Sequence, residues 1–105
     1  MSTGAAAIEA IGRIRADAYF MGVTGVHPAA DLSTGDAEEA AVKRALMQAA
    51  AETIVLASSE KLGAASPYVI AAVSDAAAIV TTEAMSDETA AAYEALGVKV
   101  IRAAG

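Results

Sequence analysis

Residues 36–59, with the sequence DAEEAAVKRALMQAAAETIVLASS, describe a helix followed by a buried strand. Asp36 suits the N-cap of the helix, and Glu39, three residues later, completes a capping-box pattern. The strand is predicted at 53–57, and the unbroken, mostly apolar run at 19–23 is typical of a strand buried on both faces of a parallel sheet. The helix is predicted over 37–51. Its buried face follows the i, i+3, i+4, i+7 spacing at Val42, Ala45, Leu46 and Ala49.

Outward from this unit, apolar runs and amphipathic segments alternate along the chain. The remaining strands are predicted at 19–23, 78–81 and 98–101, and the remaining helices at 5–15 and between Ser86, as N-cap, and Gly97, as the stop. The inner faces of these helices are predicted at Ile8, Ile11 and Ile14, and at Thr89, Ala92, Tyr93 and Leu96. Such alternation indicates an α/β domain with a mainly parallel sheet and flanking helices. The apolar stretch at 68–73 suits an edge strand, and 25–35 is predicted to be a loop.

Composition and charge exclude several classes of function. The chain has 105 residues, which suits one domain, and its 7 basic and 13 acidic residues give a net charge of −6. An acidic chain without clustered Lys and Arg is repelled by duplex DNA, so this chain alone is not expected to bind nucleic acid. Without cysteine and with one histidine, a metal site is not expected. No apolar stretch is long enough to span a membrane, so a cytoplasmic protein is expected. No cofactor is expected either.

Hydroxyl-bearing residues follow three of the predicted strands, at Thr24-Gly25, Ser58-Ser59 and Thr81-Thr82. In open α/β sheets, ligands bind beyond the carboxyl ends of the strands. Uncharged polar groups at this edge suit a ligand that carries alcohol or phosphate groups. The alternative is that Ser, Thr and Gly simply end the strands.

Two lysines are candidates for binding an anionic ligand. Lys61 lies in the loop after the second strand, where it either meets a phosphate or extends into solvent. Lys43 follows Glu39 by four residues on the predicted helix, a spacing that also describes an ordinary surface ion pair. Glu39 has a second structural explanation as the capping partner of Asp36.

Other possible catalytic and cofactor motifs are weak. His27 precedes Pro28 in the predicted loop, where a lone histidine is more often a hydrogen-bonding residue than a general base. The spacing of residues 22–25 is only G-x-x-G, which does not make a dinucleotide-binding turn. From the residues alone, the sequence predicts an α/β domain with a small polar-ligand cleft and does not identify the ligand.

Five segments, taken in order, resemble the C-terminal domain of DeoR-family regulators. They are 17–26 (DAYFMGVTGV), 32–34 (LST), 38–45 (EEAAVKRA), 55–61 (VLASSEK) and 97–101 (GVKVI). The first is similar to the family's strand and Gly-x-Asp-Gly-Ile turn, and the third to its Glu-Ala-x-Val-Lys-Arg-Ala helix. The resemblance extends through residues 6 to 103, and the chain departs from the family pattern at Thr24 and Ser58, where aspartate is common.

The resemblance implies a sensor whose fold is related to ribose-phosphate isomerases and glucosamine-phosphate deaminases. Such sensors bind a phosphorylated sugar and alter DNA binding by an attached helix-turn-helix domain. Residues 1–105 are then expected to be one partial effector-sensing domain, without the DNA-binding part and the first part of the sensor. Carried over by position, the ligand-binding candidates are Gly22, Thr24, Gly25, Glu39, Lys43 and Lys61. The lysines would supply positive charge, and Glu39 would accept sugar hydroxyls or hold Lys43.

Two other functions stay open at this point. The first is an enzyme fragment related to sugar-phosphate isomerases or deaminases, for which His27, Asp31 and Glu39 are the nearby candidates for a base. The missing carboxylates at positions 24 and 58 favour a sensor without catalytic residues. The second is an oligomerisation module. A homo-oligomer is expected in any case, because a partial sensor leaves apolar surface uncovered.

Overall fold

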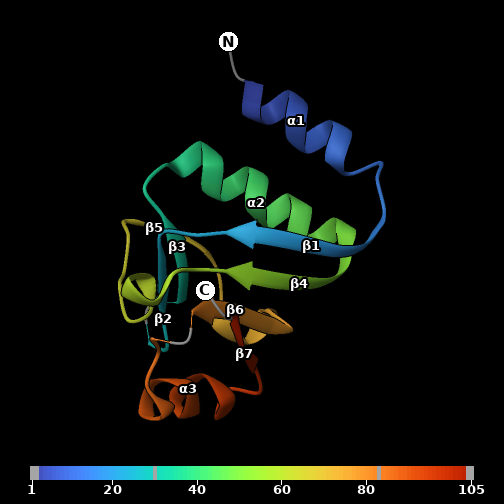
Figure 1. Ribbon diagram of the computed structural model, residues 1–105. Helices are drawn as coiled ribbons and strands as arrows, with labels where there is room; N and C mark the ends of the chain where they lie inside the picture. Colours follow the sequence, from blue (N-terminus) through green and yellow to red (C-terminus); the bar gives the residue numbers. More distant parts are fainter. Residues whose placement is uncertain (1–2, 30, 83, 104–105) are drawn as a thin grey trace.

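The computed structural model describes residues 3–29, 31–82 and 84–103 (Figure 1). In chain order the elements are α1 (Thr3–Ile11), β1 (Ala16–Gly22), β2 (Gly25–His27), β3 (Asp31–Thr34), α2 (Ala37–Ala49), β4 (Ala50–Leu56), η1 (Ser59–Lys61), β5 (Tyr68–Ala71), η2 (Val73–Asp75), β6 (Ala78–Thr82), α3 (Asp87–Glu94) and β7 (Lys99–Ala103). The two η elements are single turns of 3-10 helix.

A four-stranded parallel sheet forms the centre of the fold, with the strand order β1-β4-β6-β7. This confirms the predicted α/β class and all four predicted parallel strands. β1 and β4 begin and end earlier in the chain than their apolar runs suggested, and β7 begins and ends slightly later. The bounds differ because the apolar runs mark the buried part of each strand, whereas backbone pairing also includes polar residues.

A second sheet, with the antiparallel order β2-β3-β5, was not predicted. Its β2–β3 hairpin occupies the segment 25–35 that was predicted to be a loop, so that prediction was wrong; residue 30 lies outside the described residues. Strands of three or four residues are too short to show a clear period, and the fully buried Leu32 is fixed by packing across the two sheets. The predicted edge strand at 68–73 exists as β5, at the edge of this second sheet.

α1 is shorter than the predicted helix at 5–15 and ends at Ile11. Ile11 is buried, whereas Ile8 and Ile14 are exposed, so the predicted apolar face is only partly correct. Gly12 follows the helix directly, and glycine has a low helix propensity. α1 packs on α2 rather than on the sheet, as Figure 1 shows.

α2 begins as predicted, because the Asp36 carboxylate accepts a hydrogen bond from the Glu39 backbone N–H at 2.8 Å. The helix ends at Ala49, and the next two residues start β4 instead of continuing the helix. The face against the core is formed by Ala40, which is buried, and by Met47. The predicted face at Val42, Ala45, Leu46 and Ala49 is only half buried, and Ala45 and Ala49 line a groove shared with α1. The prediction failed because an alanine-rich helix has little contrast between its faces.

α3 has both predicted ends. The Ser86 hydroxyl accepts a hydrogen bond from the Thr89 N–H, and Gly97 has a positive φ of 84°. The N–H groups of Gly97 and Val98 bond to the carbonyls of Glu94 and Tyr93, which is the Schellman pattern. The inner face consists of Ala90 and Tyr93, with Thr89 half buried, whereas the predicted Ala92 and Leu96 are exposed.

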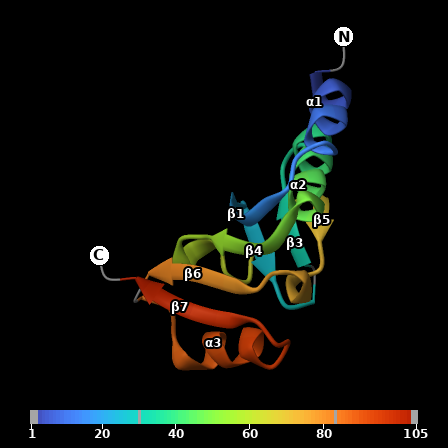
Figure 2. The same cartoon turned by 90° about the vertical axis from the view of Figure 1, so that its right-hand side faces the viewer.

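The parallel sheet is covered on one face. On that face Met21, Val55 and Ile79 are fully buried beneath α2, α3 and the second sheet. Figure 2 shows α1, α2, β3 and β5 on one side of β1, β4 and β6. Each parallel strand is added on the same side of the preceding one along the chain. Because the connections between parallel strands share one handedness, they all pass over the same face of the sheet.

The opposite face of the parallel sheet, which we call the open face, carries two rows of residues that the strand register aligns. One row is Gly22, Leu56, Val80 and Ile101, and the other is Phe20, Ile54, Ala78 and Lys99. Phe20 is 61% exposed, and Leu56 and Ile101 are exposed as well. The prediction of strands buried on both faces, which is normal for parallel sheets, was therefore wrong for this face in the described residues.

Candidate functional site

A cleft of about 600 Å³ lies at the carboxyl edge of the parallel sheet. It is lined by the ends of all four parallel strands, by one residue of α2 and by one residue of η1. The lining residues are Gly22, Val23, Thr24, Lys43, Leu56, Ala57, Ser58, Lys61, Val80, Thr81, Thr82 and Ala103. This is the position where open α/β sheets bind their ligands.

Four of the six predicted ligand-binding residues line this cleft: Gly22, Thr24, Lys43 and Lys61. Gly25 and Glu39 do not line it. Gly25 is buried in β2, and Glu39 of α2 lies beside Tyr19 and Leu46.

Lys43 reaches from α2 to the end of β1, and its side chain is only 18% exposed. Its Nζ lies 2.7 Å from Glu39 Oε1 and donates to the Gly22 carbonyl oxygen at 2.5 Å. The hydrogen bond and the charge of Lys43 hold the pKa of the Glu39 carboxyl below its ordinary value, with a smaller contribution from Thr34. An ammonium group has three N–H donors, so one remains for a ligand in the cleft.

Lys61 is the less constrained of the two cleft lysines. Its backbone is fixed in η1, where its N–H donates to the Ser58 carbonyl and its own carbonyl accepts from Ala64. Among the hydrogen bonds and ion pairs of the described residues, none involves the Lys61 ammonium group, although the charge of Lys61 helps to lower the pKa of Glu60. Lys61 can therefore turn toward an anion without first breaking a partnership.

Thr24 and Gly25 form the turn between the cleft and the hairpin. The Thr24 hydroxyl lies 2.7 Å from the Ser66 hydroxyl, which joins this turn to the loop before β5. A Cβ atom on Gly25 would lie 2.6 Å from Ser33 Oγ and 2.7 Å from the Ala64 carbonyl oxygen. Only glycine fits at position 25, so the structure gives this residue a packing role beside the cleft.

The hydroxyls at the ends of β4 and β6 differ in their partners. Ser58 donates to Glu60 at 2.7 Å, and this hydrogen bond is the main cause of the lowered pKa of the exposed Glu60 carboxyl. Thr81 is 3% exposed, and its Oγ1 has no hydrogen-bond partner in the described part of the protein. Both residues belong to the strand ends that the sequence had indicated.

Tyr93 of α3 holds in place the segments beside the cleft. The sequence placed Tyr93 on an inner helix face but did not indicate this role. Its hydroxyl donates to the Val26 carbonyl at 2.6 Å and accepts from the Gly63 N–H at 3.1 Å. Burial raises the pKa of Tyr93. These bonds connect α3 to β2 and to the segment that follows Lys61, so Tyr93 helps to fix the position of η1.

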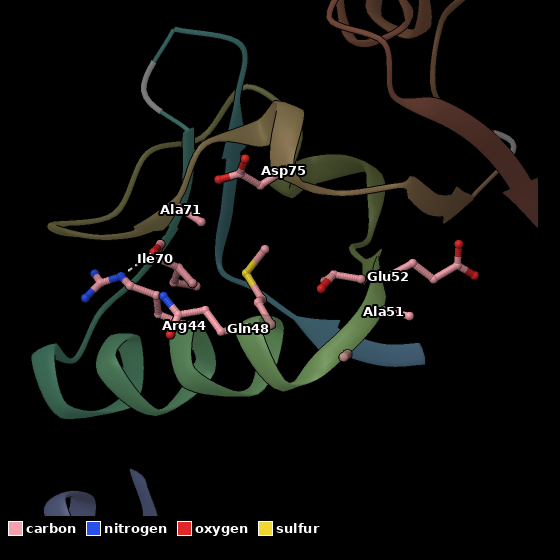
Figure 3. Close-up of a pocket in the computed structure, with 10 residues that line it drawn as sticks. Arg44, Gln48, Ala51, Glu52, Ile70, Ala71 and Asp75 are labelled. Carbon is pink, nitrogen blue, oxygen red and sulfur yellow. Dashed lines mark hydrogen bonds between the residues drawn. The ribbon is translucent and has the colours of Figure 1, made fainter. Parts of the chain in front are cut away.

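A second groove, of about 370 Å³, lies near the amino ends of the parallel strands between α2, β4 and β5. Figure 3 shows Arg44 beside Ile70, with Glu52 directed away from both. Arg44 donates to the backbone carbonyls of Ile70 and Val69, each at 2.8 Å. Its charge is therefore used to hold the exposed edge of β5 rather than to attract a ligand.

The electrostatic character of the cleft is opposite to that of the whole chain. Two of the three lysines in the sequence line it, and none of its lining residues is acidic. In the part of the chain that the structure describes, no group of three or more His, Asp or Glu side chains is placed to hold a metal ion. Within the same described ranges, no helix is long and apolar enough to cross a membrane.

The candidate bases for the enzyme alternative lie outside the lining of the cleft. His27 accepts a hydrogen bond at Nδ1 from the Ala29 N–H, as in a turn. Asp31, which has a positive φ of 68°, accepts from the Val73 N–H at 3.3 Å and so connects β3 to η2. Glu39 is engaged with Lys43.

The comparison with protein families agrees with this arrangement. A family model described as the DeoR C-terminal sensor domain matches residues 1–83, which is most of the chain. The chain therefore belongs to the DeoR C-terminal sensor domain family, the family that the sequence motifs resembled. A sensor-domain family of transcriptional regulators argues for a role other than catalysis.

Among curated proteins, the chain is similar to a protein of Bacillus subtilis (strain 168) named "Uncharacterized HTH-type transcriptional regulator FruR". The two are 37% identical over 81 residues, which cover 77% of this chain and 32% of the relative. The matched part thus spans about a third of the length of this regulator.

Proposed function

We propose that this chain is the effector-binding part of a bacterial DeoR-type transcriptional repressor of sugar metabolism and that the cleft at the carboxyl edge binds a phosphorylated sugar. The observation that carries the proposal is the charge of the cleft, which contains two lysines and no acidic lining residue in a chain of net charge −6. A local positive site in an acidic protein favours an anionic ligand. The expected relation of the fold to sugar-phosphate isomerases is part of the same proposal.

The two lysines divide the task in this proposal. Lys61, whose ammonium has no ion-pair partner among the described residues, contacts the phosphate directly. Lys43 is partly neutralised by Glu39 and fixed on the Gly22 carbonyl, so it contributes one remaining N–H and a weaker field. Of the two roles expected for Glu39, the geometry supports the one in which it holds Lys43. Thr24 and Gly22 shape the wall, and Gly25 acts by packing.

Calorimetric titration tests this proposal. The probes are ribose 5-phosphate, glucose 6-phosphate and fructose 6-phosphate, each paired with its unphosphorylated sugar, together with inorganic phosphate. We expect binding by at least one phosphorylated sugar and not by its unphosphorylated form. A charge-assisted hydrogen bond contributes about 1.5–3 kcal/mol, so Lys61→Ala should weaken that binding roughly ten- to a hundredfold.

Arg13→Ala is the charge-matched control for Lys61→Ala, because Arg13 is an exposed cation that lies outside both the cleft and the open face. It removes the same charge from the chain and should leave affinity unchanged. Equal losses in both variants would mean that only net charge matters, and the site would be wrong. Failure of all the phosphorylated sugars to bind would overturn the proposed function.

Binding without turnover is proposed, because His27, Asp31 and Glu39 all lie outside the cleft lining and are engaged elsewhere. A general base must lie within hydrogen-bond reach of the proton that it removes. Incubation with each sugar phosphate, followed by chromatographic analysis for an isomer or a deaminated product, checks this point. Formation of a product would replace the sensor by the enzyme alternative.

Contact with DNA is proposed to belong to a helix-turn-helix domain, in keeping with the description of the relative as an HTH-type regulator. A regulator of this class works where the DNA is, so a cytoplasmic location is part of the proposal. The acidic sensor contributes by responding to the effector, and residues 1–105 are proposed to form part of one effector-sensing domain.

A second copy of the chain is proposed to cover the open face. The eight residues of the open face include one charged side chain, Lys99, and several exposed apolar groups such as Phe20, Leu56 and Ile101. Exposed apolar patches of this kind usually mark interfaces. Leu56 also lines the cleft, so a partner on this face would extend one wall of the site. Light scattering should show a dimer or larger assembly; a monomer at high concentration would overturn this part of the proposal.

A further inference from the structure

The buried hydroxyls of this protein are not all satisfied in the same way. Ser33 and Thr34 are both buried in β3. The Ser33 hydroxyl accepts a hydrogen bond from the Ser66 N–H at 2.8 Å, and the Thr34 hydroxyl bonds to the Glu39 carboxylate. Thr81 in β6 is also buried, at 3% exposed, yet its Oγ1 has no hydrogen-bond partner in the described residues.

An unpaired buried hydroxyl needs an explanation, because burial removes its water partners and costs free energy unless another hydrogen bond replaces them. Valine has nearly the same shape as threonine and would fill the same space in a β-strand without that cost. A threonine at this buried position of the parallel sheet therefore points to a hydrogen-bond partner outside the described residues.

The position of Thr81 identifies where that partner comes from. Thr81 lines the cleft at the carboxyl edge, between its lining neighbours Val80 and Thr82, together with Lys43 and Lys61. The two lysines suit the phosphate of the proposed ligand. A neutral hydroxyl, which both donates and accepts, suits an alcohol group instead.

We infer that Thr81 binds a hydroxyl group of the sugar part of the ligand and so distinguishes a sugar phosphate from phosphate alone. This inference rests on the proposed function, since it needs a sugar phosphate in the cleft. It adds a residue that recognises the carbohydrate to the two that recognise charge.

Thr81→Val tests the inference, because it removes the hydroxyl and keeps the shape. The variant should weaken binding of the sugar phosphate that the wild-type chain binds best by about three- to tenfold, which corresponds to one neutral hydrogen bond. Its affinity for inorganic phosphate should be unchanged. Lys61→Ala, by contrast, should weaken the binding of both probes.

Thr53→Val is the matched control. Thr53 is also 3% exposed and lies in β4, two residues before Val55 on the covered face, but it does not line the cleft. It should leave both affinities unchanged. Melting of the ligand-free chains gives a second readout: Thr81→Val should melt at the same temperature as wild type or higher, because an unpaired hydroxyl is lost.

The outcomes separate the two proposals. If Lys61→Ala weakens sugar-phosphate binding and Thr81→Val does not, the role of Thr81 is wrong and the proposed function stands. A lower melting temperature for ligand-free Thr81→Val would show that the hydroxyl has a partner within the protein, which also overturns the inference. If the wild-type chain binds no sugar phosphate, both proposals fail.

Discussion

The two ends of the parallel sheet use their positive charges in opposite ways. At the carboxyl edge, Lys61 is held in place through its backbone, and its ammonium faces a cleft without acidic lining residues. Near the amino edge, the Arg44 guanidinium donates hydrogen bonds to the carbonyls of Val69 and Ile70. It lies beside a groove that is also lined by Glu52 and Asp75 (Figure 3).

The difference shows that a cavity and a nearby cation do not by themselves indicate a ligand site. The groove at Arg44 is a well-formed hollow, but its cation already completes the edge of β5 and its acidic residues oppose an anion. The cleft at Lys61 offers uncommitted donors and lies where the strand ends of this fold class bind ligands. The three predictions that follow change one end at a time.

The largest effect is expected for Gly25→Ala, which disturbs the support of the carboxyl edge. The added Cβ would meet Ser33 Oγ at 2.6 Å and the Ala64 backbone oxygen at 2.7 Å, so the hairpin or the facing loop must move. Overpacking of this kind costs about 1–3 kcal/mol. Urea unfolding followed by circular dichroism measures the loss.

Gly22→Ala is the control for Gly25→Ala, because a Cβ on Gly22 would meet nothing within 4 Å. Its free energy of unfolding should stay within about 0.5 kcal/mol of wild type. Similar losses for the two variants would show that the close contact at Gly25 does not decide the effect.

A smaller loss, about 1–2 kcal/mol, is expected for Arg44→Ala at the amino edge. The variant removes two charge-assisted hydrogen bonds to β5, although their partial exposure reduces their contribution. Affinity for sugar phosphates should not change. Gln48→Ala, one turn further along α2 and also exposed, should alter stability by less than about 0.5 kcal/mol. Weaker ligand binding by Arg44→Ala would contradict the contrast between the two ends.

The smallest effect is expected for Glu39→Gln, and it depends on pH. The pKa of the Glu39 carboxyl in the folded chain lies below its ordinary value of 4.5, chiefly because of the hydrogen bond with Lys43. The pair therefore stabilises the fold fully above pH 4.5, and this contribution is lost as the pH falls through the lowered folded-state pKa. An i, i+4 pair contributes about 0.2–0.5 kcal/mol.

Unfolding curves of wild type and Glu39→Gln at pH 7 and at successively lower pH below 4.5 measure this contribution. The wild-type chain should be slightly more stable at pH 7, and the two should converge at the lowest pH. If the stability advantage of wild type over Glu39→Gln grew on acidification, the Glu39 carboxylate would destabilise the fold. The proposed stabilising pair with Lys43 would then be wrong.

The parts of the fold that the sequence predicted are those governed by local effects. Asp36 and Ser86 cap helices through bonds to N–H groups three residues away, and Gly97 ends α3 through its backbone conformation. The strand-end rule likewise located Thr24 and Lys61 at one edge. The hairpin at 25–35 was not predicted, because its strands are short and are buried by packing against the other sheet. The helix faces were misplaced because alanine marks a buried side weakly.

The sequence by itself therefore determined the alternation of helix and parallel strand, the helix caps and the family, since each depends on residues close together in the chain. Only the tertiary structure decided that Gly25 is needed for packing, that Lys43 is held on the Gly22 carbonyl, that Tyr93 reaches Val26 and that Thr81 lacks a partner. The physical reason is that the contacts of Gly25, Lys43 and Tyr93 join residues 8 to 67 positions apart, whose approach is set by the packing of whole elements. No local pattern in the sequence records such distances.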